Sequence, residues 1–141
     1  MTEEEAKRRF AEARVARLAT VTPADEPHLV PICFAVDQEA DTIYSAVDAK
    51  PKTTPDLKRL RNIDAHPHVT VLVDYYDDEW ARVWWVRVDG TAAVQNRNDH
   101  GRRLLAAKYP QYAGAGADAQ LGRMVVIRAT KWTSWAYTDP V

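Results

Sequence analysis

Three short apolar segments follow one another near the start of the chain, at residues 15–22, 29–36 and 42–47. Short turns rich in Pro, Asp and Glu separate them. Strands joined by such short connections pair as antiparallel neighbours, because a parallel partner needs a long crossover. Pro31 lies within the second segment and has no N–H to donate, which predicts a sheet edge or a bulge at that position.

The remaining chain adds strands and a few helices. Apolar periodicity predicts strands at residues 69–74, 83–94 and 124–137, the last as one long strand or a bent pair, with Gly90 as a candidate bulge. Capping residues and prolines predict helices at residues 2–14, from about 55 to 66, and from 98 to about 109. About six strands with few helices between them exclude a parallel βαβ sheet. We therefore expect residues 1–141 to form one mainly β domain, an antiparallel six-stranded barrel with flanking helices.

Composition narrows the class of protein. Hydrophobic residues make up 46% of the chain and charged residues 28%, which excludes a disordered chain. The net charge of −1 argues against a surface built for nucleic acid or an anionic membrane. A charged N-terminus and the lack of any long apolar run predict a cytoplasmic protein without a membrane span. The single cysteine, Cys33, excludes an internal disulfide and a Cys/His zinc set, and its apolar surroundings predict a small core residue.

One segment concentrates positive charge between residues 50 and 61. Its five cations are Lys50, Lys52, Lys58, Arg59 and Arg61, and its one acid is Asp56. This segment is expected to be a loop that opens into a helix, and such a helix start offers free N–H groups and a positive dipole end to an anion. The functional interpretation is a phosphate clamp, and the alternative is a solvated helix face.

The tryptophans form a second signal. Trp84 and Trp85 are adjacent on one predicted strand, so the two-residue period places them on opposite faces. One indole is therefore expected in a pocket or a subunit interface, although core packing explains each tryptophan nearly as well. The four histidines show no partners that would make a metal or catalytic site, and we expect no metal. From the residues alone, no reaction is indicated.

The order of segments resembles a known family. An N-terminal helix leads into RLATVT, a return strand VPICFAVD, a basic helix that continues into VTVLVD, and a long strand ending in VRVDGTA. Together these resemble the pyridoxamine-5′-phosphate-oxidase-like split β-barrel superfamily, most closely its actinobacterial branch that uses the deazaflavin coenzyme F420. The resemblance covers residues 4–137. It implies a split β-barrel that binds its cofactor at the interface of a homodimer.

The resemblance also assigns phosphate-binding residues. In the oxidases of this superfamily an Arg-Lys pair at the start of the basic helix holds the phosphate of FMN, and that pair falls on Lys58 and Arg59, the same charges in reversed order. Lys50 and Lys52 are the candidates for further contacts with an anionic cofactor tail. Charged hydrogen bonds of this kind are strong, so the resemblance favours the clamp over the solvated face.

The ring-binding positions depart from the oxidases. Trp85 takes the place of a glutamine that contacts the flavin ring, which argues against ordinary FMN oxidase chemistry and favours F420. Pro31 and Cys33 belong to the strand expected to line the ring pocket. Trp132, with Trp135, corresponds to a C-terminal tryptophan near the flavin.

The leading hypothesis is a homodimeric oxidoreductase that binds F420 and transfers hydride to or from a small organic substrate. The protein would supply binding, orientation and exclusion of water, while the chemistry belongs to the cofactor. The alternatives are an FMN-dependent enzyme of the same fold and a non-catalytic flavin- or F420-binding protein. A nucleic-acid module has the least support, because it would need the basic segment to extend over the surface.

Overall fold

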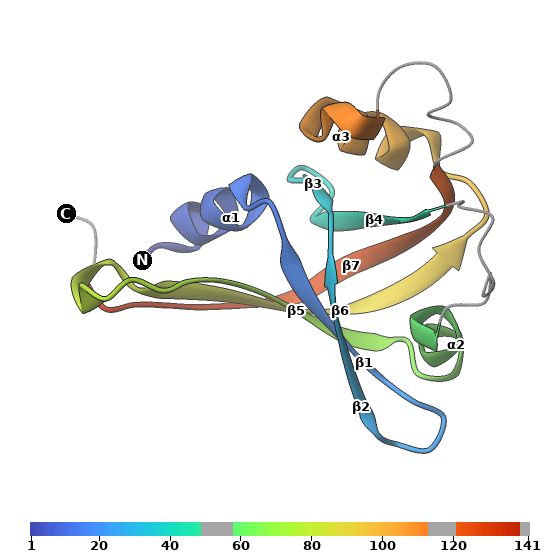
Figure 1. The fold of residues 1–141 in the computed structure, drawn as a ribbon, viewed down its shortest axis with the longest axis horizontal. Helices are drawn as coiled ribbons and strands as arrows, with labels where there is room; N and C mark the ends of the chain where they lie inside the picture. Colours follow the sequence, from blue (N-terminus) through green and yellow to red (C-terminus); the bar gives the residue numbers. More distant parts are fainter. Residues whose placement is uncertain (49–57, 113–120, 139–141) are drawn as a thin grey trace.

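The computed structural model describes residues 1–48, 58–112 and 121–138, and within them the strands form a single antiparallel sheet of seven (Figure 1). The spatial order is β2-β1-β5-β6-β7-β4-β3. The strands are β1 (Ala16–Val21), β2 (Pro27–Ile32), β3 (Ala35–Asp37), β4 (Thr42–Asp48), β5 (His68–Tyr75), β6 (Trp84–Gln95) and β7 (Leu121–Ala136). The mainly β antiparallel fold expected from the sequence is therefore confirmed.

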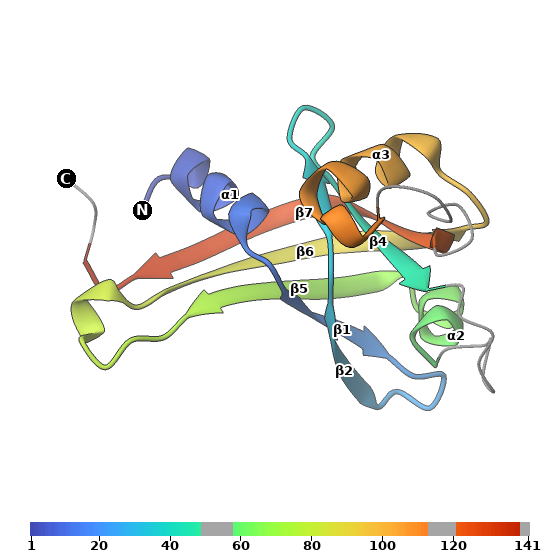
Figure 2. The same ribbon diagram turned by 45° about the horizontal axis from the view of Figure 1, so that its top comes forward.

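In the described part of the chain three α-helices flank the sheet: α1 (Glu3–Glu12), α2 (Lys58–Ala65) and α3 (Asp99–Lys108). Figures 1 and 2 show β5, β6 and β7 running together as a long ribbon, which the β1–β2 hairpin crosses. The helix α1 lies over the ribbon, α3 lies beside β3 and β4, and α2 lies near the hairpin. Short 3-10 turns at Trp80–Arg82 and Pro110–Tyr112 complete the connections.

The strand count differs from the predicted six because the stretch 29–36 is two strands. β2 pairs with β1, and β3 pairs with β4 at the other edge of the sheet. Between them Phe34 leaves the ladder, and the Tyr109 hydroxyl takes its place as a partner. The hydroxyl lies 3.1 Å from both the backbone nitrogen and the backbone oxygen of Phe34, so it can accept from one and donate to the other.

The Gly90 prediction is confirmed in position. The register between β6 and β7 shifts between Asp89 and Gly90, and the extra residue, Thr130, lies on β7. A Cβ at Gly90 would lie 2.5 Å from the carbonyl oxygen of Arg128, so the close approach of the two strands requires glycine. Pro31 lies in β2, which is an edge strand, as its missing N–H predicts.

The core lies on the inner face of the sheet, beneath α1. Phe10 of α1 is fully buried, and its ring packs 5.1 Å from Phe34 and 5.2 Å from Trp132, centroid to centroid. Thr2 caps α1 by accepting from the backbone N–H of Glu5. The Glu5 carboxylate accepts from Arg8 and Arg9, which lowers its pKa to about 2.

A second cluster joins α3 to β3 and β4. Asn98 caps α3, as predicted, by accepting from the backbone N–H of Gly101 at 2.8 Å. Gly101 packs directly on the ring of Tyr44, and a Cβ there would lie 2.5 Å from the Tyr44 Cδ1 atom. Lys108 ends the helix with its Nζ atom buried 3.7 Å from the centroid of the Phe34 ring. Among the described residues this ammonium has no hydrogen-bond partner, so the aromatic face is its main contact.

The contact between Gly101 and Tyr44 predicts the effect of Gly101→Ala. Overpacking against a buried ring costs about 1–3 kcal/mol, which exceeds the roughly 1 kcal/mol that alanine gains over glycine in a helix. We expect a net loss of about 1 kcal/mol in the free energy of unfolding, measured by urea denaturation. Ala107→Gly, at an exposed position of α3, measures the propensity term separately. A Gly101→Ala variant more stable than the wild type would contradict this packing.

Burial predicts a pH dependence from Lys108. Desolvation, helped by the nearby charge of Arg14, lowers the pKa of Lys108 from 10.5 to about 8. Between pH values of about 8 and 10.5 the Lys108 side chain is protonated in the unfolded chain and deprotonated in the folded protein. The contribution of Lys108 to the free energy of unfolding therefore rises with pH over this range. We expect the urea midpoint of the wild type, relative to Lys108→Met, to increase from pH 7.5 to pH 10. Lys131→Met, at an exposed lysine, controls for the loss of a charge. An unchanged difference would show that Lys108 is solvated in the folded protein.

Candidate functional site

The basic helix α2 packs against β1 and β6 through one apolar side. Leu60 and Ile63 are buried in the main core. Asn62 is fully buried as well, and its amide Nδ2 donates to the Thr20 hydroxyl of β1 at 3.0 Å. This arrangement turns Lys58 to solvent and leaves Arg59 half-buried. The helix therefore presents positive charge beside the sheet.

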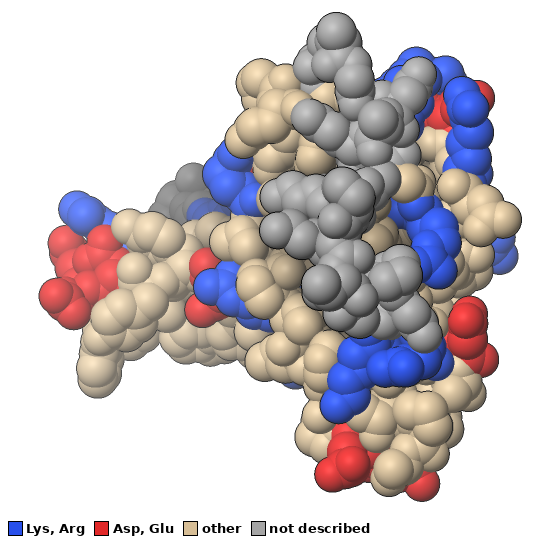
Figure 3. Space-filling view, turned by 45° about the vertical axis from the view of Figure 1, so that its right-hand side comes forward, with Lys and Arg blue, Asp and Glu red and all other residues tan. Residues whose placement is uncertain are grey.

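Part of the predicted clamp lies outside the described residues, namely Lys50 and Lys52. The described part comprises Lys58, Arg59 and Arg61. Figure 3 shows this end of the molecule, where basic side chains form several patches, one of them at the level of α2. Among the described cations Lys58 and Arg61 are exposed and Arg59 is half-buried, and their role as a clamp stays a prediction.

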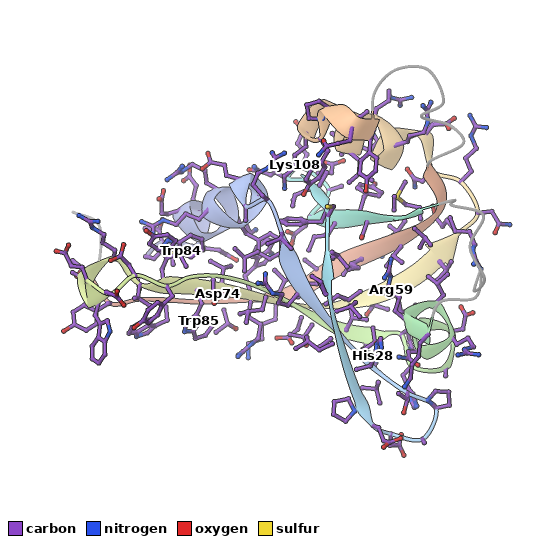
Figure 4. The ribbon with its side chains drawn as sticks, in the orientation of Figure 1. His28, Arg59, Asp74, Trp84, Trp85 and Lys108 are labelled. Atoms are coloured by element: carbon purple, nitrogen blue, oxygen red, sulfur yellow. The ribbon has the colours of Figure 1, made fainter. Side chains whose placement is uncertain are left out.

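A polar cluster lies between α2 and the β1–β2 hairpin. His28 of β2 stands opposite Thr20 of β1, which holds Asn62. The His28 Nδ1 and Asn62 Oδ1 atoms are both buried, and neither has a hydrogen-bond partner among the described residues. A buried polar atom left unpaired costs about 1–3 kcal/mol, so such atoms often mark the position of a ligand or an ordered water. Figure 4 shows His28 and Arg59 at this end of the molecule.

The cluster fits an anionic group better than an apolar one. It combines an imidazole nitrogen with the charges of Arg59 and Lys58 on the neighbouring helix. Sequence reasoning missed His28, since it has no partner close in the chain. A signal was present in the alternation of β2, because residues 28, 30 and 32 share the inward face.

The ring-pocket candidates Pro31 and Cys33 are both exposed, the first within β2 and the second just after its end. Cys33 is exposed, so its prediction as a small core residue is wrong. The reason is alternation: Ile32 turns into the core, and its neighbour turns away from it. Pro31 is exposed too, and it stands opposite Arg17 of β1. Pro31 therefore belongs to the outer face of the sheet, whereas Cys33 lies close to Lys108 and Tyr109 at the end of α3.

Trp85 shares this outer face, as the two-residue period predicts. It stands between Asp74 of β5 and Trp135 of β7, and the Arg87 guanidinium lies 5.3 Å from the centroid of its ring. Figure 4 shows Trp84 and Trp85 on opposite sides of the long ribbon. The six residues from Trp85 to Thr91, where β6 pairs with the start of β5, span about 20 Å. Within one chain, Trp85 is thus far from α2.

Trp132 lies on the inner face and is not brought together with the other candidates. Its indole N–H donates to the Asp41 carboxylate at 3.0 Å, and its ring packs against Phe10. Lys7 lies 5.3 Å from the centroid of the same ring. These contacts give Trp132 a structural environment at the base of α1.

Two grooves lie outside α2. One, of about 360 Å³, separates the segment after α1 from β5, and its polar and aromatic lining includes Arg9, Arg14, Arg17, Asp74, Tyr75 and Trp84. The other, of about 500 Å³, crosses β4, β6 and β7 and includes Arg128 and Tyr44. Among the residues that the structure describes, no cluster of His, Cys, Asp and Glu could hold a metal ion. The described helices include none long and apolar enough to cross a membrane.

His100, like His28, has a role that sequence reasoning missed. Its Nε2 atom lies 2.8 Å from the Asp37 carboxylate at the end of β3, which joins α3 to that strand. The histidine holds the pKa of Asp37 below its usual value, and backbone N–H groups of Ala40 and Glu39 act in the same direction. Both side chains lie apart from α2, so this pair supports the fold and not the polar cluster.

Comparisons with known proteins agree with this fold. A conserved hypothetical protein of Mycobacterium tuberculosis has a TM-score of 0.76 and 22% identity, over 96% of this chain and 85% of that one. An FAD-binding protein of Mesorhizobium loti has a TM-score of 0.69 and 20% identity, over 95% and 94%. A conserved protein of unknown function from Corynebacterium diphtheriae has a TM-score of 0.66 and 18% identity, over 98% and 96%. At these identities the likeness shows a shared fold.

No curated protein matches the sequence. A family model does: the one described as pyridoxamine 5′-phosphate oxidase matches residues 2–136. That span includes β1 to β7 and all three α-helices, so the match concerns the complete sheet. The chain therefore belongs to the pyridoxamine 5′-phosphate oxidase family and has its split β-barrel fold.

Proposed function

We propose that this protein is an oxidoreductase that binds the deazaflavin coenzyme F420, with the cofactor phosphate held at α2. The observation that carries the proposal is the basic helix beside a buried imidazole nitrogen that has no hydrogen-bond partner among the described residues, in a chain that belongs to a family of flavin enzymes. Lys58 and Arg59 are the proposed phosphate ligands, because they occupy the positions of the family's phosphate-binding pair. Lys50 and Lys52, outside the described residues, are proposed for the anionic tail.

The chain's own residues would bind and orient the cofactor. Arginine and lysine donate charged hydrogen bonds to phosphate oxygens, and these bonds are roughly twice as strong as neutral ones. F420, when bound, would supply the hydride chemistry. Pro31, Cys33 and Trp85 would lie against the ring and keep water from it. The substrate would be a small organic molecule.

A second copy of the chain would complete the site. The outer face exposes large apolar side chains, among them Leu29, 67% exposed, and Trp135, 44% exposed. Exposed apolar surface of this kind marks an interaction site. Since Trp85 and α2 lie far apart within one chain, a cofactor that touches both requires the Trp85 of one protomer to approach the α2 of its partner. We therefore propose a homodimer with the cofactor between the subunits.

FMN is the second candidate cofactor. The family is described as an oxidase of pyridoxamine 5′-phosphate, and one solved structure of the same fold is described as FAD-binding. Trp85 in place of the family's glutamine favours F420. A protein that binds either cofactor without catalysing a reaction is the remaining alternative, and weak reaction with every acceptor despite tight binding would support it.

Loss of the clamp predicts loss of the cofactor. We compare the affinities for F420 and for FMN in fluorescence titrations. We expect Lys58→Ala/Arg59→Ala to lower the affinity for the preferred cofactor on the order of 100-fold, since each charged hydrogen bond contributes about 1.5–3 kcal/mol. Arg103→Ala, at an exposed arginine of α3, is the control, because it removes a positive charge away from α2. It should change the affinity less than threefold. If both variants lost affinity equally, the effect would reflect general charge attraction and no specific clamp. If the wild type bound neither cofactor, the proposed function would be refuted.

The dimer predicts a second result. We expect the wild type to sediment as a dimer and Leu29→Glu to sediment as a monomer, since the charge would be buried against the partner. Leu29 is exposed within one chain, so the variant should keep its circular dichroism spectrum and fold. Ala107→Glu, at an exposed position of α3, should remain dimeric. A monomeric wild type, or a dimer unaffected by Leu29→Glu, would show that the outer face is not the interface.

A further inference from the structure

We propose that His28 is a phosphate ligand that makes the site selective for phosphorylated cofactors. The inference rests on the proposed function, because it concerns the same cofactor site. It adds a residue from the β1–β2 hairpin to a clamp that sequence reasoning confined to α2 and the segment before it. His28 would bind the phosphate and take no part in the reaction itself.

Two contacts tie the hairpin to α2 and bring His28 to it. The Asn62 amide donates to the Thr20 hydroxyl at 3.0 Å, and Thr20 is the cross-strand neighbour of His28. At the other end of the helix, the His66 Nε2 atom lies 3.5 Å from the carboxylate of Asp25 in the hairpin turn. Cross-strand neighbours have Cβ atoms about 5 Å apart, so His28 lies next to the side of α2 that carries Asn62.

Arg59 lies on that same side of α2. It precedes Asn62 by three residues, and side chains three apart are neighbours on a helix surface. Figure 4 shows Arg59 and His28 at the same end of the molecule, one on α2 and the other on β2. An anion bound by Arg59 from the helix side is therefore within reach of the imidazole on the hairpin side.

The chemistry of the imidazole suits this role. Its Nδ1 atom is buried and has no hydrogen-bond partner in the described part of the chain. A protonated Nδ1 donates a hydrogen bond to a phosphate oxygen, and the anion in turn removes the cost of the unpaired polar atom. The Asp25 carboxylate of the hairpin turn pairs with His66, and among the described residues no carboxylate pairs with the Nδ1 atom of His28. A phosphate is therefore a better partner for His28 than the acid of this turn.

The test compares cofactors with and without a phosphate. The titrations use F420 against its phosphate-free deazaflavin chromophore, and FMN against riboflavin. We expect His28→Leu to lower the affinity for the phosphorylated member of the preferred pair by about tenfold. The affinity for the phosphate-free member should fall by less than twofold. His28→Asn should recover part of the loss, because its amide nitrogen can take the place of Nδ1. His68→Leu, at an exposed histidine of β5, is the matched control and should change neither affinity.

Equal weakening of both members of a pair by His28→Leu would overturn the inference, since it would show a structural role alone. If the wild type binds neither F420 nor FMN, the proposed function fails, and inorganic phosphate then decides the inference separately. In that arm the imidazole signals of His28 are followed by NMR, with His28→Asn used to assign them. A saturable shift on addition of phosphate would support His28 as an anion ligand. Unchanged signals would show that phosphate does not bind at Nδ1, with an ordered water as its partner instead, and would overturn the inference.

Discussion

The hydroxyl of Tyr109 holds the point at which the chain passes from one edge of the sheet to the other. It accepts from the backbone N–H of Phe34, and the carbonyl oxygens of Phe34 and Arg14 lie 3.1 and 3.0 Å away as acceptors for its proton. Phe34 is fully buried, so its backbone groups would have no water to replace this partner. Three features meet here: the change from β2 to β3, the end of α3 and the entry into β1. One polar atom thus determines how the two halves of the barrel are joined.

Local rules explain why much of this fold was predictable from the sequence. Alternation predicts that Trp84 and Trp85 face opposite ways, and Asn98 is recognisable as a helix cap, because both depend on residues a few positions away. The break after Ile32 is different. It depends on Tyr109, which lies 75 residues after its partner Phe34, and no local pattern marks it. Cys33 was expected in the core because its neighbours are apolar, although its alternation with the buried Ile32 turns it away from the core.

The residues of the candidate site also fall into two groups, those that the sequence predicts and those that only the structure reveals. Positive charge on α2 is a property of neighbouring residues, so Lys58 and Arg59 stand out in the sequence. The polar cluster exists only because α2 packs on β1 and brings Asn62 to Thr20. Its most informative member, His28, therefore required the structure. A single strand, β2, serves two surfaces, since its alternate residues face the polar cluster and the outer face of the sheet in turn.

The prolines of β2 also limit how copies of this chain can associate. Backbone N–H groups alternate along a strand, so residues 27, 29 and 31 direct their nitrogens to the same side, and a proline is tolerated only where that side is open. Pro27 and Pro31 leave Leu29 as the only one of these three residues that can donate there. An incoming strand would find most of its acceptors unmatched, which hinders continuation of the sheet from molecule to molecule. A two-fold contact through the face of the sheet would close after two copies, whereas growth along this edge would lead to polymers.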